Sequence, residues 1–227
     1  MLIRIPNVLT PAQIAACRTT LEKADWMDGA ITTGPLSKAV KHNMQVPASH
    51  PVGRRLGDMI LGALHQNKLF ARAALPLKVV PPSFNRYTGG QSYGNHVDAT
   101  VQHVWGSADR IRTDLSATLF LSEPEEYDGG ELTLHDELGE RAIKLPAGDM
   151  VLYPATSVHH VTPVTRGTRL AAFFWMQSMV RDDAKRSLLF ELGTALQDYE
   201  QALPEHPALV RLTGVYFNLF RLWTDTS

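Results

Sequence analysis

Two side chains that can bind a metal ion, His96 and Asp98, stand two positions apart in the stretch GNHVDA at residues 94–99. On a β-strand, residues two apart project from the same face, so these side chains would point together while Val97 faces the other way. Two ligands on one strand edge make half of a metal site. The sequence should therefore supply a third ligand from a distant segment.

Candidates for that ligand occur in YPATSVHHVTPVTRGTRLAAF, where His159 and His160 are adjacent. If the backbone is extended there, only one of the two can face the site. Two imidazoles and one carboxylate form a facial triad, which suits ferrous iron because it leaves the opposite coordination positions for substrate and oxygen. Spacing alone leaves the choice between the two histidines open. We expect His103 and His135 to be structural or exposed rather than ligands.

The composition limits the kinds of metal site and partner. Cys17 is the only cysteine of the 227 residues, so an intramolecular disulfide and a multi-cysteine zinc site are both excluded. The formal net charge is -1, which gives no reason to expect nucleic acid as a partner. Arg4, Pro6 and Pro11 interrupt the start where a signal peptide needs an apolar run, and no later stretch approaches a membrane span. We expect one main domain in a cytoplasmic protein without a membrane partner.

Helical signals dominate the first 77 residues. Thr10 can cap a helix, Pro11 suits its first position and Gln13 completes a capping box. A second helical stretch follows at residues 50–70, with an apolar stripe. We therefore interpret residues 1–77 as an N-terminal helical flank.

Short apolar or alternating runs separated by turn signals fill residues 78–178 and predict a β sandwich or barrel. The run RLAAFFWMQS at residues 169–178 is apolar on both faces, which favours a central strand. Residues 179–227 return to helical patterns, with Val215, Leu219 and Leu222 at helical spacing in the last one. This C-terminal extension is predicted to be a helical hairpin, packed on the barrel or on a second subunit of a homo-oligomer.

Four segments together resemble a known family: FNRYTGGQSYGNHVDA, RTDLSATLFLS, YDGGEL and the long stretch LPAGDMVLYPATSVHHVTPVTRGTRLAAFFWMQSMVRDD. The chain resembles the iron(II) and 2-oxoglutarate dependent dioxygenases, in the prolyl 4-hydroxylase-like group, and is most similar to the PiuC-like PKHD-type hydroxylases of bacteria. The resemblance implies an α+β fold: a double-stranded β-helix, or jelly roll, at 78–178 between the two helical flanks.

The same resemblance implies roles for individual residues. His96, Asp98 and His159 would bind iron, because the family keeps the distal histidine ten positions before a basic residue, here Arg169. The planar guanidinium of Arg169 would bind the distal carboxylate of 2-oxoglutarate. Tyr87 and Tyr93 precede the HxD pair as tyrosines do in prolyl hydroxylases, so one of them, preferably Tyr87, is expected to contact 2-oxoglutarate. Aromatic filling of the barrel mouth is the alternative.

The implied activity is hydroxylation of a substrate with O2, with release of succinate and CO2 and with L-ascorbate as reductant. The substrate is a small molecule or a peptide; PiuC-like relatives suggest a link with bacterial iron uptake. Collagen-type prolyl hydroxylases usually carry Lys where this chain has Arg169, so their substrate does not transfer. Two other classes remain open: a non-catalytic jelly-roll binding module and a cupin-like metallohydrolase.

Overall fold

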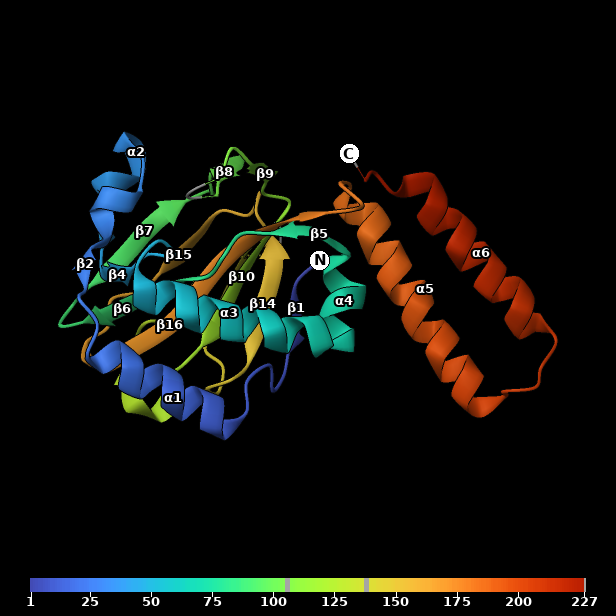
Figure 1. Cartoon of the computed structure of the whole chain (residues 1–227), viewed down its shortest axis with the longest axis horizontal. Coiled ribbons are helices and arrows are strands. Elements are labelled where there is room, and N and C mark those ends of the chain that lie inside the picture. Colours follow the sequence, from blue (N-terminus) through green and yellow to red (C-terminus); the bar gives the residue numbers. More distant parts are fainter. Residues whose placement is uncertain (105–106, 137–138, 227) are drawn as a thin grey trace.

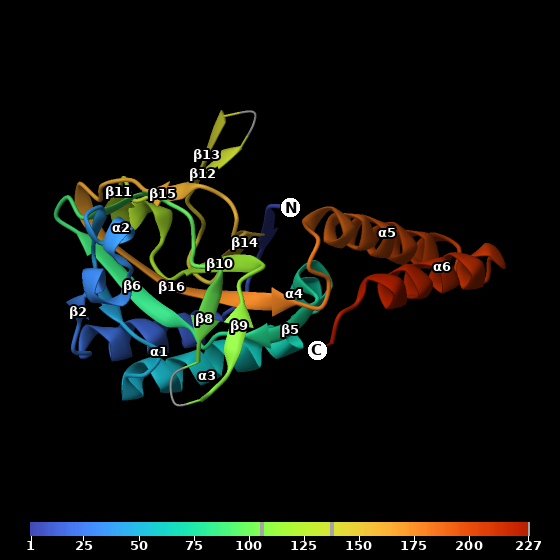
Figure 2. The ribbon, with the colours of Figure 1, turned by 90° about the horizontal axis from the view of Figure 1, so that it is seen from above.

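The computed structural model describes residues 1–104, 107–136 and 139–226 of the chain. Two antiparallel sheets lie face to face, and helices cover the outer face of the larger one (Figures 1 and 2). Within the described residues, the major sheet has nine strands and the minor sheet five. This arrangement confirms the predicted α+β fold with a jelly-roll core.

The major sheet has the spatial order β1 (Ile3–Ile5), β14 (Met150–Pro154), β10 (Leu115–Phe120), β16 (Arg166–Ser178), β6 (Ser83–Thr88), β4 (Met44–Val46) and β2 (Met27–Asp28), and β5 (Pro76–Val79) and β11 (Tyr127–Asp128) also pair with β16. The minor sheet has the order β13 (Gly139–Ile143), β12 (Leu132–Asp136), β15 (His159–Val161), β7 (Ser92–His96) and β3 (Lys41–His42). A separate hairpin joins β8 (Val101–His103) to β9 (Arg110–Arg112).

Strand β16 lies at the centre of the major sheet, as its two apolar faces predict. Its register with β10 and β6 is regular, with Thr118 opposite Phe173 and Tyr87 opposite Arg169. Ala172 and Met176 face the core beneath the helices. Because strand side chains alternate, Arg169 and Phe173 face the other side, toward the minor sheet. One strand thus closes the core and lines the cavity.

Three helices build the core on the outer face of the major sheet (Figure 1). They are α1 (Pro11–Glu22), α3 (Pro51–Gln66) and α4 (Lys68–Ala74); shorter turns are the 3₁₀ segments Gly29–Thr32 and Pro124–Glu126 and the single turn α2 (Pro35–Lys38). The predicted capping box of α1 is present, because Thr10 Oγ1 accepts from the Gln13 amide and Gln13 Oε1 accepts from the Thr10 amide. The stripe of Leu56, Ile60 and Leu64 on α3 is buried.

Residues 1–77 are not helical throughout, which corrects the prediction for this flank. Strands β1 to β4 lie within it and extend both sheets: β1 pairs with β14, β4 with β6, and β3 with β7. Each has only two or three residues, too few for an alternating pattern to stand out in the sequence. The flank therefore contributes to the walls of the cavity as well as to its helical cover.

The C-terminal helices α5 (Asp183–Ala202) and α6 (Ala208–Trp223) form the predicted hairpin, which extends away from the sheets (Figures 1 and 2). The packed face of α6 consists of Tyr216, Leu219, Phe220 and Trp223. Val215 and Leu222, predicted to share a face with Leu219, are exposed instead. Among the described residues, no helix has both the length and the apolar composition that crossing a membrane requires.

Candidate metal centre

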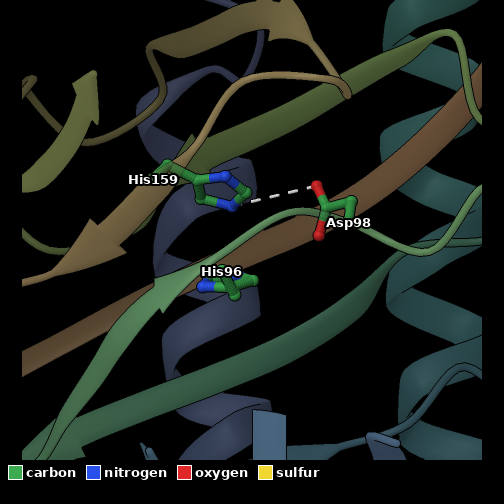
Figure 3. A group of neighbouring side chains, drawn as sticks. All are labelled: His96, Asp98 and His159. Atoms are coloured by element: carbon green, nitrogen blue, oxygen red, sulfur yellow. Dashed lines mark ion pairs between the residues drawn. The ribbon is translucent and has the colours of Figure 1, made fainter. Parts of the chain in front are cut away.

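The structure brings His96, Asp98 and His159 together at the cavity between the sheets (Figure 3). His96 ends β7, Asp98 follows in the next loop, and His159 begins β15 directly opposite His96. One potential ligand atom from each residue lies within 4.8 Å of the others, and His159 Nε2 is 3.8 Å from Asp98 Oδ2. His160 faces the opposite side of the sheet, where it contacts His135. Of the two adjacent histidines, His159 therefore completes the cluster.

Backbone carbonyls orient both imidazoles of the cluster. His96 Nδ1 donates to the Gly94 carbonyl at 2.9 Å, and His159 Nδ1 donates to the Ser157 carbonyl at 3.0 Å. Each ring thus keeps the Nε2 lone pair available, as a metal ligand requires. Burial, together with the neighbouring His159, lowers the pKa of His96 to about 4. Two neutral imidazoles and a carboxylate are a donor set that fits ferrous iron.

The carboxylate of Asp98 is held from the opposite sheet. Ser116 Oγ on β10 donates to Asp98 Oδ2 at 2.6 Å. This contact fixes one carboxylate oxygen and links the loop after β7 to the major sheet. The sequence analysis missed Ser116. Its signal is the alternation of Ser116 and Thr118 with apolar residues in a strand that is buried along its whole length.

Arg169 is a buried cation that lines the same cavity. Its side chain is 1% exposed, its guanidinium carbon is 5.3 Å from the ring centroids of Tyr87 and Phe120, and Nη1 donates to Asn85 Oδ1 at 3.3 Å. Nε has no partner, and the ion pairs formed by the described residues do not include Arg169. Burying an unpaired charge is costly, whereas a carboxylate would bind both donors of the guanidinium fork. The cavity is therefore suited to an anion at this end.

A glycine turn makes room for Arg169. Gly129 and Gly130 have φ values of +71° and +69°, and they form the predicted turn before β12. A Cβ on Gly130 would lie 3.0 Å from Arg169 Cδ and 2.8 Å from a methyl group of Val164. Position 130 thus requires glycine for its conformation and for the close approach of the arginine.

The two tyrosines occupy different parts of the cavity, whose volume is about 970 Å³. Tyr87 is buried and lies directly opposite Arg169 in the sheet register. Burial raises its pKa to about 12, so its hydroxyl keeps the proton and can donate. Tyr93 instead stacks on His96, with ring centroids 3.6 Å apart. The structure therefore places Tyr87 at the arginine end and Tyr93 at the triad.

A lysine that the sequence analysis did not single out also lines the cavity. Lys41 is 6% exposed, its Nζ donates to Thr32 Oγ1 at 3.1 Å, and it lies 5.1 Å from the Tyr93 ring centroid. Burial lowers its pKa to about 8, although Asp98 favours the charged form. A single lysine in a two-residue strand gives no recognisable pattern, so only the structure identifies it.

Comparison with known proteins identifies the family. The 2OG-Fe(II) oxygenase superfamily model matches residues 82–177, and the PKHD-type hydroxylase C-terminal domain model matches residues 183–225. A PKHD-type hydroxylase of Bordetella pertussis is 57% identical over 225 residues, covering 99% of this chain and all of the relative. The chain belongs to the PKHD-type hydroxylase family. The PKHD-type hydroxylase PiuC of Pseudomonas aeruginosa is 52% identical, with the same coverage.

Solved structures share the fold of this PKHD-type hydroxylase at low sequence identity. A prolyl-4-hydroxylase of Pseudomonas putida has a TM-score of 0.52 at 19% identity and covers 78% of this chain and 92% of its own. The carbocyclase SnoK of nogalamycin biosynthesis has a TM-score of 0.55 at 17% identity and covers 79% of this chain and 80% of its own. These structures show a shared fold, whereas the family models and the relatives make the protein an Fe(II)- and 2-oxoglutarate-dependent oxygenase.

Proposed function

We propose that this PKHD-type hydroxylase binds Fe(II) through His96, Asp98 and His159, and the distal carboxylate of 2-oxoglutarate through Arg169. The bound iron would supply oxygen activation, and the products would be a hydroxylated substrate, succinate and CO2. The observation that carries the proposal is the buried, unpaired guanidinium of Arg169 in the same cavity as the triad. This cation, together with the Asp98 ligand, favours an oxygenase over a zinc hydrolase.

The surrounding side chains would prepare the site for both ligands. Ser116 holds one oxygen of Asp98, and Tyr93 fixes the ring plane of His96 by stacking. Tyr87 and Phe120 exclude water around Arg169, which strengthens its attraction for a carboxylate. The Tyr87 hydroxyl is our preferred second donor to 2-oxoglutarate because Tyr87 lies opposite Arg169.

The reductant and the location belong to the same proposal. L-Ascorbate would return iron to the ferrous state after turnovers in which no substrate is hydroxylated. We place the enzyme in the cytoplasm, whose reducing conditions favour ferrous iron and a free thiol. Burial raises the pKa of the Cys17 thiol to about 12, so that thiol would be an unreactive core residue there.

The substrate is proposed to be a small molecule or a peptide linked to bacterial iron uptake, with no nucleic acid partner. The similarity to PiuC supports this assignment. The cavity lies at the upper end of the size range of small-molecule sites, so it can accept a substrate beside 2-oxoglutarate. Lys41 and Tyr93 would then form part of the wall that the substrate meets.

A homo-oligomer through α5 and α6 is a further part of the proposal. Leu188 on α5 and Val210, Phe217 and Leu222 on α6 are each more than half exposed. A hairpin that extends from the body with apolar side chains on its surface would bury them against a second copy. Light scattering of the full chain measures the mass directly.

The test of the proposed activity is turnover without a known substrate. The purified protein is supplied with Fe(II), O2, ascorbate and 2-oxoglutarate, and succinate is measured over time. We expect slow succinate formation that His159→Ala abolishes. Binding of stoichiometric iron with no succinate would favour the non-catalytic module, and indifference to 2-oxoglutarate would favour the metallohydrolase.

A further inference from the structure

Polar side chains form a row across four neighbouring strands on the outer face of the minor sheet. The row runs from Glu140 on β13 through His135 on β12 and His160 on β15 to Asn95 on β7. Asn95 and His160 are the direct neighbours of His96 and His159, so they project from the face opposite the cavity. Neither His135 nor His160 belongs to the triad at the cavity.

Two potential ligand atoms of this row lie close to a third, His135 Nε2. His135 Nε2 is 3.1 Å from His160 Nδ1 and 3.1 Å from Asn95 Oδ1. Two nitrogens that each bind zinc at about 2.0–2.1 Å are separated by roughly 3.0–3.4 Å, so this spacing is that of ligands sharing one ion. A proton on His135 Nε2 that is donated to both Asn95 Oδ1 and His160 Nδ1 is the other arrangement that fits these two distances.

Glu140 lies beside the central histidine of the row. Its Oε1 lies 3.5 Å from His135 Nδ1, on the side of the ring away from His160. A carboxylate that accepts from one imidazole nitrogen leaves the other nitrogen's lone pair for a metal and raises its basicity. Glu140 thus lies beside the ring nitrogen that a metal-bound His135 would leave free to donate.

We propose that His135, His160 and Asn95 form a second metal site, specific for divalent transition ions that favour imidazole, such as Zn²⁺ or Cu²⁺. Two nitrogens and a neutral amide oxygen suit these ions better than Mg²⁺ or Ca²⁺, which prefer all-oxygen sites. Solvent would complete the coordination, because Asn95 is exposed and both histidines are partly exposed. The proposal does not depend on the function assigned to the cavity.

Occupation of this outer site would act on the strands that carry the triad. β7 presents His96 inward and Asn95 outward, and β15 presents His159 inward and His160 outward. An ion bound outside would therefore cross-link β7, β15 and β12. Since it binds only the folded chain, it would also raise the stability of the protein.

The test removes most of the inner site and titrates the outer one. In tag-free full-length protein carrying His96→Ala and Asp98→Ala, Zn²⁺ binding is measured by calorimetry, with folding checked by circular dichroism. We expect one Zn²⁺ per chain. Adding His135→Ala or His160→Ala should weaken binding at least about tenfold, and Glu140→Gln about tenfold. His65→Ala, an exposed histidine on α3, is the matched control and should change nothing.

Two further readouts separate a metal site from a shared proton. Zn²⁺ should raise the midpoint of thermal unfolding of the background variant but not of its His135→Ala derivative. Pulsed electron paramagnetic resonance of bound Cu²⁺ should detect two imidazoles in the background variant and one after His160→Ala. Absence of Zn²⁺ binding in the background variant, or equal binding after His135→Ala and His65→Ala, would overturn the proposal and leave an ordinary hydrogen-bonded histidine pair.

Discussion

The two ends of the cavity are built in different ways. At the triad, both histidines are oriented by carbonyls only two residues away, at Gly94 and Ser157. At the other end, Arg169 is held by Asn85, which is 84 residues away in the chain, by the ring of Tyr87 on the same strand β6, and by the ring of Phe120 on β10. One end depends on local backbone geometry and the other on long-range packing.

The two ends thus differ in what they provide: the triad orients its ligand atoms, and the arginine end provides affinity for a carboxylate. The triad needs fixed directions, because its Nε2 and carboxylate atoms must converge on one ion, and short-range hydrogen bonds give that at little cost. The arginine end needs a dry environment, because an unpaired guanidinium attracts a carboxylate most strongly where water is excluded. Substitutions at the triad should therefore lower the affinity for iron, and substitutions at the arginine end should lower the affinity for 2-oxoglutarate.

The largest effect is expected at the triad. His159→Ala removes a proposed iron ligand, so the loss of iron affinity should exceed the roughly 10–100-fold that loss of an outer partner typically costs. Iron content after anaerobic reconstitution measures it. Val158→Ala, an exposed neighbour, is the control and should bind iron normally. Equal iron content in the two variants would mean that His159 is not a ligand.

At the other end, Arg169→Ala should leave iron binding intact and weaken the binding of 2-oxoglutarate. Loss of one partner of a buried charge pair costs about 2–5 kcal/mol, which corresponds to roughly 30-fold to more than 1000-fold in affinity. The increase in the KM for 2-oxoglutarate measures this loss of affinity. Arg169→Lys should recover part of the affinity, because lysine keeps the charge without the planar fork.

Arg169→Met tests the arginine end through the thermal stability of the ligand-free protein. It removes an unpaired buried charge, so the ligand-free variant should unfold at a higher temperature than the wild type, by about 2–4 °C for each kcal/mol gained. A lower unfolding temperature would show that the contacts with Asn85, Tyr87 and Phe120 outweigh the cost of burying the charge, and would contradict a cation kept for an anion.

A smaller effect is expected at the contact between the two sheets. Ser116→Ala removes the 2.6 Å hydrogen bond to Asp98, and iron affinity should fall about tenfold, the lower limit for such partners. Competition with a chelator measures this loss. Ser116→Thr keeps the hydroxyl and should restore most of the affinity; failure of both variants alike would indicate that packing of β10 matters instead.

The smallest effect distinguishes the tyrosines. Tyr87→Phe removes a hydroxyl near Arg169, and the KM for 2-oxoglutarate should rise a few-fold, as loss of one hydrogen bond worth about 0.5–1.5 kcal/mol implies. Tyr93→Phe keeps the ring that stacks on His96 and should leave this KM unchanged. The reverse result would assign the cosubstrate contact to Tyr93.

The same division explains what the sequence could predict. The HxD pair and the alternation in β16 are local patterns, so the triad strands and the central strand followed from the sequence and the resemblance. Ser116, Asn85 and Lys41 reach the cavity through pairing between distant strands, which periodicity does not encode. The short strands of the N-terminal flank were missed because two or three residues carry no period.

The measurement that tests the central claim most directly is an anaerobic titration of the Fe(II)-loaded protein with 2-oxoglutarate, followed by the weak visible charge-transfer band of a chelated keto acid. The account predicts a band in the wild type, a band that needs at least about 30-fold more 2-oxoglutarate in Arg169→Ala, and none in His159→Ala. An iron-loaded wild type without the band, or an unshifted titration in Arg169→Ala, would contradict the assignment of the two ends to one active site.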